Sequence, residues 1–151
     1  MLKIITIIIV YLIGLVSFAQ NSQEVNSLNE IKESLKVTAL VKNVVSDQGT
    51  IQFAIYDSEE SFKQRKPLEA KGVSINNGVA KVSFEGLNPK TYAIICYHDA
   101  NGNGKMDFQE NGMPLEDYGA TNNVFNYGPP QFNNAKFELI DKDLTFEIKF
   151  M

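Results

Sequence analysis

Apolar and polar residues alternate in short runs over most of the chain from position 35 onward. In the first run, Val37, Ala39 and Val41 alternate with Lys36 and Thr38. A period of two residues is typical of a β-strand with one buried face. The pattern predicts seven strands, over residues 35–42, 51–56, 71–75, 79–84, 92–98, 135–140 and 144–150.

Turn residues separate these runs. Asn76-Asn77-Gly78 predicts a tight hairpin, because Asn and Gly tolerate the positive φ that such turns require. Ser58 is suited to cap a short helical turn over residues 58–64. Leu87 and, five residues later, Tyr92 predict a tyrosine corner, in which the Tyr hydroxyl bonds to backbone slightly upstream.

Together these features predict an all-β fold. We expect an immunoglobulin-like or transthyretin-like β-sandwich of about seven strands, with a small open barrel as the alternative. One long loop, residues 99–134, interrupts the pattern. Structureless loops of more than about fifteen residues are uncommon in compact domains unless they have a function.

The N-terminal segment has the layout of a secretory signal peptide. Lys3 precedes an apolar run over residues 4–16, and Ser17-Phe18-Ala19 supplies a cleavage site. The alternative, a membrane anchor, needs about twenty apolar residues. We therefore expect a signal peptide at 1–19, a flexible leader at 20–33 and a domain at 34–151. No membrane span would remain after cleavage, and the protein would be periplasmic or extracellular.

Charge and cysteine content bear on which ligands the protein can bind and on whether it forms a disulfide. The formal net charge is −4, and loss of Lys3 with the signal peptide makes it −5. Nucleic-acid binding requires a basic face, so this charge argues against it and is compatible with binding a cation. The chain has one cysteine, Cys96, so it forms no internal disulfide. Its apolar surroundings predict a buried, inert thiol.

The strongest motif lies at the start of the long loop. Residues 99–110 match the pattern D-x-[DN]-x-[DN]-G-x5-E of calcium-binding EF-hand loops at every specified position. Calcium takes six to eight oxygen ligands, which this spacing supplies from alternate residues, and Gly104 permits the sharp turn between them. The predicted ligands are Asp99, Asn101, Asn103, the backbone carbonyl of Lys105, Asp107 and Glu110.

The surroundings of this motif differ from those of an EF-hand. A predicted strand precedes it, and Gly112 and Pro114 oppose a helix after it. We therefore expect an EF-hand-like loop on a sandwich, with a solvated Asn- and Gly-rich turn as the alternative. Magnesium is disfavoured because it requires compact octahedral geometry. Only three of the ligands are carboxylates, which favours weak binding, with Kd of about 10⁻⁴ to 10⁻³ M.

Other functions remain open at this point. A hydrolase-type enzyme would use His98, Glu116 and Asp117 in the long loop, although no nucleophile and base pair is recognisable. A carrier would hold a small apolar ligand between the sheets. The aromatic residues Phe125, Tyr127 and Phe132 either form a sugar- or peptide-binding face or pack the loop against the sandwich.

Several runs of residues resemble a bacterial family, the "domain of unknown function 2141". They are residues 87–93, 98–107, 112–116, 118–119, 122–123 and 128–132. The family usually has Pro-Gly before its Thr-Tyr pair, where this chain has Pro89-Lys90. The resemblance implies a sandwich in a small exported protein. It implies no activity, because the family is uncharacterised.

The sequence thus favours an exported calcium-binding β-sandwich module with a binding or structural role in the cell envelope. Calcium is the expected cofactor, and no catalytic residue is assigned. The expected partner, besides the calcium ion, is an envelope protein or a glycan.

Overall fold

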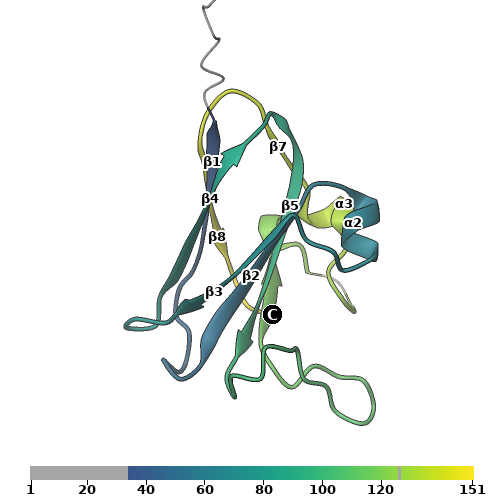
Figure 1. The fold of residues 1–151 in the computed structure, drawn as a ribbon. Coiled ribbons are helices and arrows are strands. Elements are labelled where there is room, and N and C mark those ends of the chain that lie inside the picture. The colour runs from purple at the N-terminus through teal and green to yellow at the C-terminus, as the bar shows by residue number, and fades with distance from the viewer. Residues whose placement is uncertain (1–33, 126) are drawn as a thin grey trace, which may run out of the picture. The chain divides into compact units, whose positions relative to one another are not determined.

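The computed structural model describes residues 34–125 and 127–151 (Figure 1). The predicted signal peptide and leader lie outside the described residues. Residues Ser34–Met151 form one compact unit. In the described part of the chain, no helix is long and apolar enough to cross a membrane.

The described residues contain eight strands and three short helical segments. The strands are β1 (Leu35–Val41), β2 (Thr50–Tyr56), β3 (Glu69–Ser74), β4 (Ala80–Leu87), β5 (Lys90–Asp99), β6 (Tyr118–Ala120), β7 (Phe137–Leu139) and β8 (Leu144–Ile148). The helical segments are α2 (Glu59–Lys63), the 3₁₀ turn η1 (Thr121–Asn123) and α3 (Phe132–Ala135).

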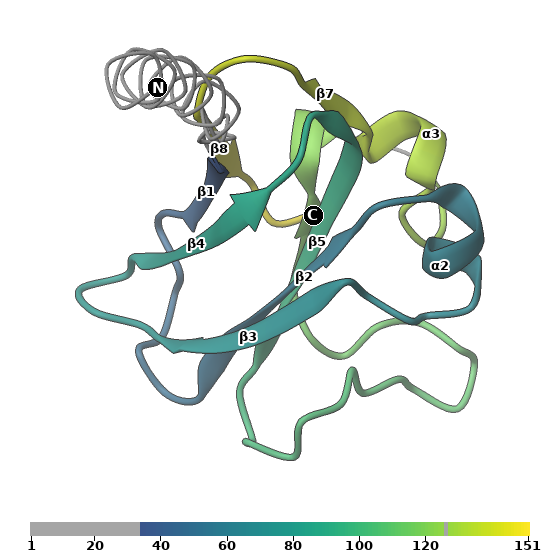
Figure 2. The same cartoon turned by 45° about the horizontal axis from the view of Figure 1, so that its top comes forward.

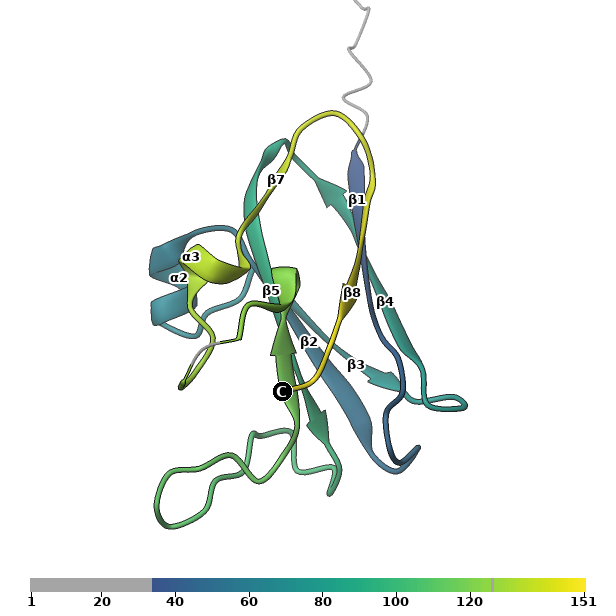
Figure 3. The same ribbon diagram turned by 180° about the vertical axis from the view of Figure 1, so that it is seen from behind.

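The strands form two sheets that face each other (Figures 1 and 3). One sheet has the order β4-β1-β8, with β1 and β8 parallel. The other has the order β3-β2-β5-β6, and β7 pairs with the first residues of β5. The expected all-β sandwich is confirmed, with eight strands in place of about seven, and the sheets do not close into the alternative barrel.

The long loop predicted at 99–134 is only partly irregular. Residues Tyr118–Ala120 form β6 by pairing with Ile95–Tyr97, and η1 and α3 follow. Three residues are too few to display a period of two, so β6 exists because of its partner strand. The predicted strand at 135–140 is shortened to β7, Phe137–Leu139, because Ala135 belongs to α3. The irregular part is residues 100–117, called the 100–117 loop below.

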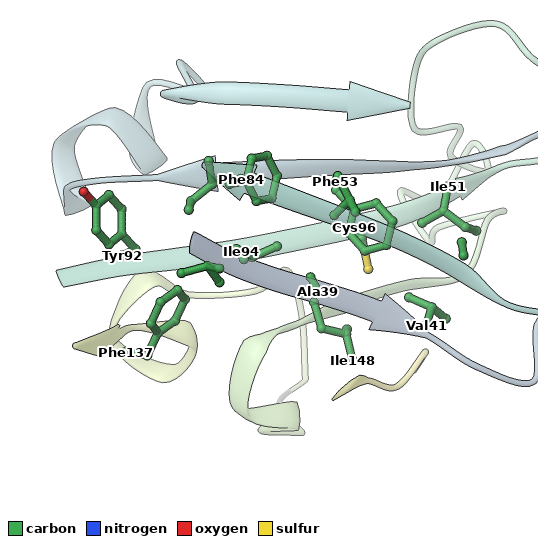
Figure 4. Close-up of a cluster of buried hydrophobic side chains, with 14 of the residues drawn as sticks. Ala39, Val41, Ile51, Phe53, Phe84, Tyr92, Ile94, Cys96, Phe137 and Ile148 are labelled. Atoms are coloured by element: carbon green, nitrogen blue, oxygen red, sulfur yellow. The ribbon is translucent and has the colours of Figure 1, made fainter. Parts of the chain in front are cut away.

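Apolar side chains from both sheets fill the space between them (Figure 4). Phe53, Ile51 and Ile94 of one sheet meet Phe84 and Ile148 of the other, and each is at most 1% exposed. This interleaving explains why the alternating positions of the sequence identify the core. The filled space also leaves the carrier hypothesis without a structural basis in the described residues.

The predicted local turns are confirmed. Asn77 and Gly78 both have positive φ, at 52° and 73°, as a type I′ hairpin requires. The Asn76 and Val79 backbones on either side exchange two hydrogen bonds. At the start of α2, the Ser58 side chain accepts a hydrogen bond from the Ser61 N–H.

The tyrosine corner is also confirmed. The Tyr92 hydroxyl donates a hydrogen bond to the Asn88 carbonyl oxygen at 2.9 Å. Tyr92 is 3% exposed and packs beside Phe137, at 6.3 Å between ring centroids. The bond therefore fixes the turn between β4 and β5, the strand that leads to the 100–117 loop.

Tyr92→Phe is expected to lower the free energy of unfolding by about 1 kcal/mol, because it leaves the Asn88 carbonyl without this donor. Urea denaturation measures the change. Tyr118→Phe is the matched control, since its exposed hydroxyl makes a longer bond, 3.3 Å, to Gly128. That variant is expected to change stability by less than about 0.5 kcal/mol. Equal effects from the two substitutions would contradict a special role for the corner.

Candidate metal site

The 100–117 loop projects beyond the end of the sheet, between the last residue of β5 and the first of β6 (Figures 1 and 2). Its base is held on both sides. Asp99 pairs with Thr50 in the β2–β5 ladder, and the His98 N–H donates to the Asp117 carbonyl at 2.8 Å. The loop therefore starts and ends on fixed backbone.

The carboxylate of Asp99 organises the first turn of the loop. Asp99 is 1% exposed, although it is charged. Its Oδ1 accepts from the Asn103 N–H at 3.0 Å, and its Oδ2 accepts from the Gly104 N–H at 2.9 Å. The Gln52 side-chain amide donates to Oδ2 at 3.4 Å. Gly104 has a φ of 71°, the backbone conformation that glycine adopts at least cost.

Two Asn side chains and Asp107 continue the arrangement. Asn101 Oδ1 accepts from the Asn103 N–H at 3.0 Å, and Asn103 Oδ1 accepts from the Lys105 N–H at 2.8 Å. Both amide groups donate to the same Asp107 oxygen, at 2.7 and 2.8 Å. Five of the six residues predicted as ligands are therefore joined in one network: Asp99, Asn101, Asn103, Lys105 and Asp107.

Glu110, the sixth predicted ligand, lies outside this network. A bridge between Phe108 and Pro114 and hydrogen bonds between Gln109 and Met113 and between Gly112 and Gln109 form a small hairpin. Glu110 lies on the turn of this hairpin and is exposed. Its side chain makes no hydrogen bond or ion pair with other described residues. In an EF-hand a helix follows the loop, whereas here the hairpin carries Glu110 away.

Glu116 is the acidic residue that contacts the network. Its Oε1 accepts from the Ala100 N–H at 3.1 Å, and its Oε2 accepts from the Asp107 N–H at 3.1 Å. The sequence placed Glu116 only among possible hydrolase residues. It lies six positions beyond the motif, so no spacing rule connected it to the loop.

Three carboxylates share the surroundings of Tyr97. Burial raises the pKa of the Tyr97 hydroxyl, and the negative charges of Asp99, Glu116 and Asp107 raise the same pKa further. Even so, in the described part of the chain no three His, Cys, Asp or Glu side chains are grouped closely enough to enclose a metal. Any cation bound here would depend on amide and carbonyl oxygens as well.

The residues suggested for hydrolysis are not arranged as a catalytic group. The His98 ring is stacked on Phe150, and its Nε2 lies 2.7 Å from the Gln48 carbonyl. The Glu116 carboxylate is bonded to backbone, and Asp117 meets His98 through its own backbone carbonyl. Among the described residues, no hydrogen bond joins the imidazole to either carboxylate.

Cys96 is 2% exposed, and burial raises the pKa of its thiol well above the usual range. The thiolate, which is the reactive form, is therefore disfavoured. The prediction of a buried thiol is confirmed.

The aromatic residues of the former long loop fall into two groups. Phe132 is buried and packs on Phe62, at 5.8 Å between ring centroids. Phe125 and Tyr127 are 69% and 98% exposed and contact each other edge to face at 5.5 Å. Packing thus accounts for the first aromatic residue and not for the other two.

Comparison with protein families gives a match over residues 40–147, to a family described as an uncharacterised protein conserved in bacteria, the "domain of unknown function 2141". The chain belongs to this family. The match begins in the last two residues of β1, ends within β8, and includes the whole 100–117 loop. The resemblance seen in the sequence is therefore confirmed, and the family itself carries no assigned activity.

No curated protein matches the chain. Among solved structures, the chain is similar to a pilus-presented adhesin, with 12% sequence identity and a TM-score of 0.22. The similarity covers 80% of this chain and 27% of the adhesin. At this TM-score it supports no conclusion about fold or function.

Proposed function

We propose that this member of the family is an exported β-sandwich module that binds one calcium ion in the 100–117 loop. The proposed donors are side-chain oxygens of Asp99, Asn101, Asn103 and Asp107 and the carbonyl of Lys105. Water completes the six to eight oxygens that calcium requires. Glu110 is not among the donors, because the hairpin holds it away from the others.

One observation carries the proposal. Four of the five side chains predicted as ligands meet in a single network around the buried Asp99 carboxylate. Asn101 and Asn103 both donate to Asp107 Oδ2 there, so a cation that binds this oxygen must displace their amide groups. Because each Asn side chain also carries an oxygen, rotation of the amide would present a ligand in place of a donor.

Weak binding is expected from this set of donors. It includes only two carboxylates, Asp99 and Asp107, and low ligand charge reduces affinity for calcium. A Kd of about 10⁻⁴ to 10⁻³ M is sufficient in extracellular modules, which meet calcium at similar concentrations. The ion would order the 100–117 loop against the end of the sandwich. The module would then present that loop to an envelope protein or a glycan.

Calcium is expected to raise the melting temperature of the mature protein. At a free calcium concentration of ten times Kd, binding to the folded state alone adds about 1.4 kcal/mol to the free energy of unfolding. For a domain of this size that corresponds to a rise of about 3 to 8 °C. Calorimetry in about 10 mM calcium and in chelator measures the difference, given a Kd in the millimolar range or below.

Two controls separate a specific site from a general ionic effect. Magnesium at the same concentration is expected to give a much smaller rise. Asp107→Asn is expected to remove most of the calcium effect, whereas Asp141→Asn makes the same charge change on an exposed turn residue and should preserve it. An unchanged melting temperature of the wild-type protein in millimolar calcium would refute the proposed function.

A further inference from the structure

The geometry points to Glu116, six residues beyond the twelve-residue motif, as the residue that holds the 100–117 loop in the conformation that binds calcium. This inference rests on the proposed function, and it gives Glu116 the closing role that the motif assigns to Glu110. Glu116 is a positioning residue in this account: it acts through the backbone of the loop and does not itself bind the ion.

The carboxylate of Glu116 joins the two ends of residues 99–107, the segment that carries the proposed calcium ligands and is called the ligand segment below. Its two oxygens each accept one backbone N–H at 3.1 Å, from Ala100 and from Asp107. Ala100 follows the first proposed ligand, and Asp107 is the last one. A single side chain therefore fixes the separation between the two ends of the segment that carries all five proposed donors.

These two hydrogen bonds of Glu116, called the Glu116 clasp below, matter because calcium needs several oxygens at about 2.3 to 2.6 Å at the same time. Without the Glu116 clasp, the residues from 100 to 107 would lose two of the hydrogen bonds that keep Asp107 near Asp99, and more order would have to be gained on binding. Groups that orient metal ligands typically change affinity by about 10- to 100-fold when they are removed.

The contrast with Glu110 supports this assignment. Glu110 is exposed on the turn of the hairpin, whereas Glu116 is half-buried and bonded at both oxygens. The hydrogen bonds of Glu116 to Ala100 and Asp107 therefore connect it to the proposed ligands, whereas the Glu110 side chain makes no hydrogen bond or ion pair with the described residues.

A matched pair of variants tests the inference. Glu116→Gln and Glu110→Gln make the same chemical change, but only the first places an amide NH₂ group against a backbone donor. Titration calorimetry is expected to show calcium binding about 10- to 100-fold weaker for Glu116→Gln. For Glu110→Gln we expect a Kd within about threefold of wild type, since the Glu110 side chain makes no hydrogen bond or ion pair with the described residues. A larger loss for Glu110→Gln would overturn the inference.

Bound terbium distinguishes positioning from ligation. Tyr97, beside the loop, can transfer excitation energy to Tb³⁺, and lifetimes in H₂O and D₂O count the waters on the ion. The expected result for Glu116→Gln is weaker binding with an unchanged number of waters. An increase in bound water would make Glu116 a ligand and overturn the positioning role. A lower melting temperature in chelator with an unchanged affinity would reduce Glu116 to a structural residue, and would also overturn it.

The Glu116 clasp can be tested without calcium. In chelator, amide hydrogen exchange at Ala100 and Asp107 is expected to accelerate in Glu116→Gln and to stay unchanged in Glu110→Gln. If wild type binds no calcium but this exchange pattern appears, the proposed function is refuted, and so is the inferred effect of Glu116 on calcium affinity. The two hydrogen bonds of Glu116 would still be supported. If wild type binds calcium and the two amides exchange normally in Glu116→Gln, the inference fails alone. Glu116→Asp, with its charge kept and its reach shortened, should behave as Glu116→Gln does and replaces it if the amide variant does not fold.

Discussion

Asp99→Ala is expected to weaken calcium binding by more than about 100-fold and to lower the free energy of unfolding by about 2 to 4 kcal/mol. The carboxylate is 1% exposed and accepts hydrogen bonds from the Asn103 and Gly104 backbones and from Gln52. Truncation leaves these donors without their acceptor at a part-buried position, where water replaces it only in part. It also removes the first proposed ligand.

Two controls make this expectation specific. Asp99→Asn keeps the volume and one acceptor oxygen, so it should cost less stability than Asp99→Ala while still weakening calcium binding. Asp141→Ala removes an exposed carboxylate and should change stability by less than about 0.5 kcal/mol. Urea denaturation in chelator and calorimetric titration provide the two measurements. Wild-type stability of Asp99→Ala in chelator would show that the buried carboxylate does not organise the loop.

Gly49→Ala is expected to lower the free energy of unfolding by about 2 to 5 kcal/mol. Gly49 has a φ of 78°, and a Cβ there would lie 2.1 Å from the Asp99 carbonyl oxygen and 2.8 Å from the Ala100 Cα. Both contacts are with backbone, so no side-chain rotation relieves them. The strand end that carries Asp99 must therefore move, and we expect calcium affinity to fall together with stability.

Gly102→Ala is the matched control for Gly49→Ala. Its φ of 73° is nearly the same, but an added Cβ meets no atom within 4 Å. It should therefore incur only the backbone penalty, about 1 kcal/mol. The difference between the two variants, measured by urea denaturation, isolates the overlap at the base of the loop. Equal losses would mean that the contact between Gly49 and Asp99 contributes nothing.

Local chemistry made much of this structure predictable. The alternation of apolar residues located the core strands because side chains on a strand point to opposite faces. The hairpin at Asn77 and Gly78 and the bond from Tyr92 depend on residues close in sequence, and both were found. The turn chemistry of Asp99, Asn101 and Asn103 is local for the same reason. A sequence pattern can predict such features because each depends only on residues that are close together in the chain.

The tertiary structure decided what depends on distant partners. Strand β6 is three residues long and forms because β5 supplies its hydrogen bonds, so the alternation of apolar residues did not predict it. The motif spaces oxygens along the chain, and the absence of a following helix was expected from Gly112 and Pro114, but the sequence did not predict the hairpin closed by Phe108 and Pro114. As a result Glu110 lies outside the network of Asp99, Asn101, Asn103 and Asp107, and Glu116, which directly precedes the start of β6, contacts Ala100 and Asp107. The sequence by itself determined the strands other than β6 and the turn residues of the first nine motif positions, 99–107, and only the folded chain brought Glu116, in place of Glu110, against them.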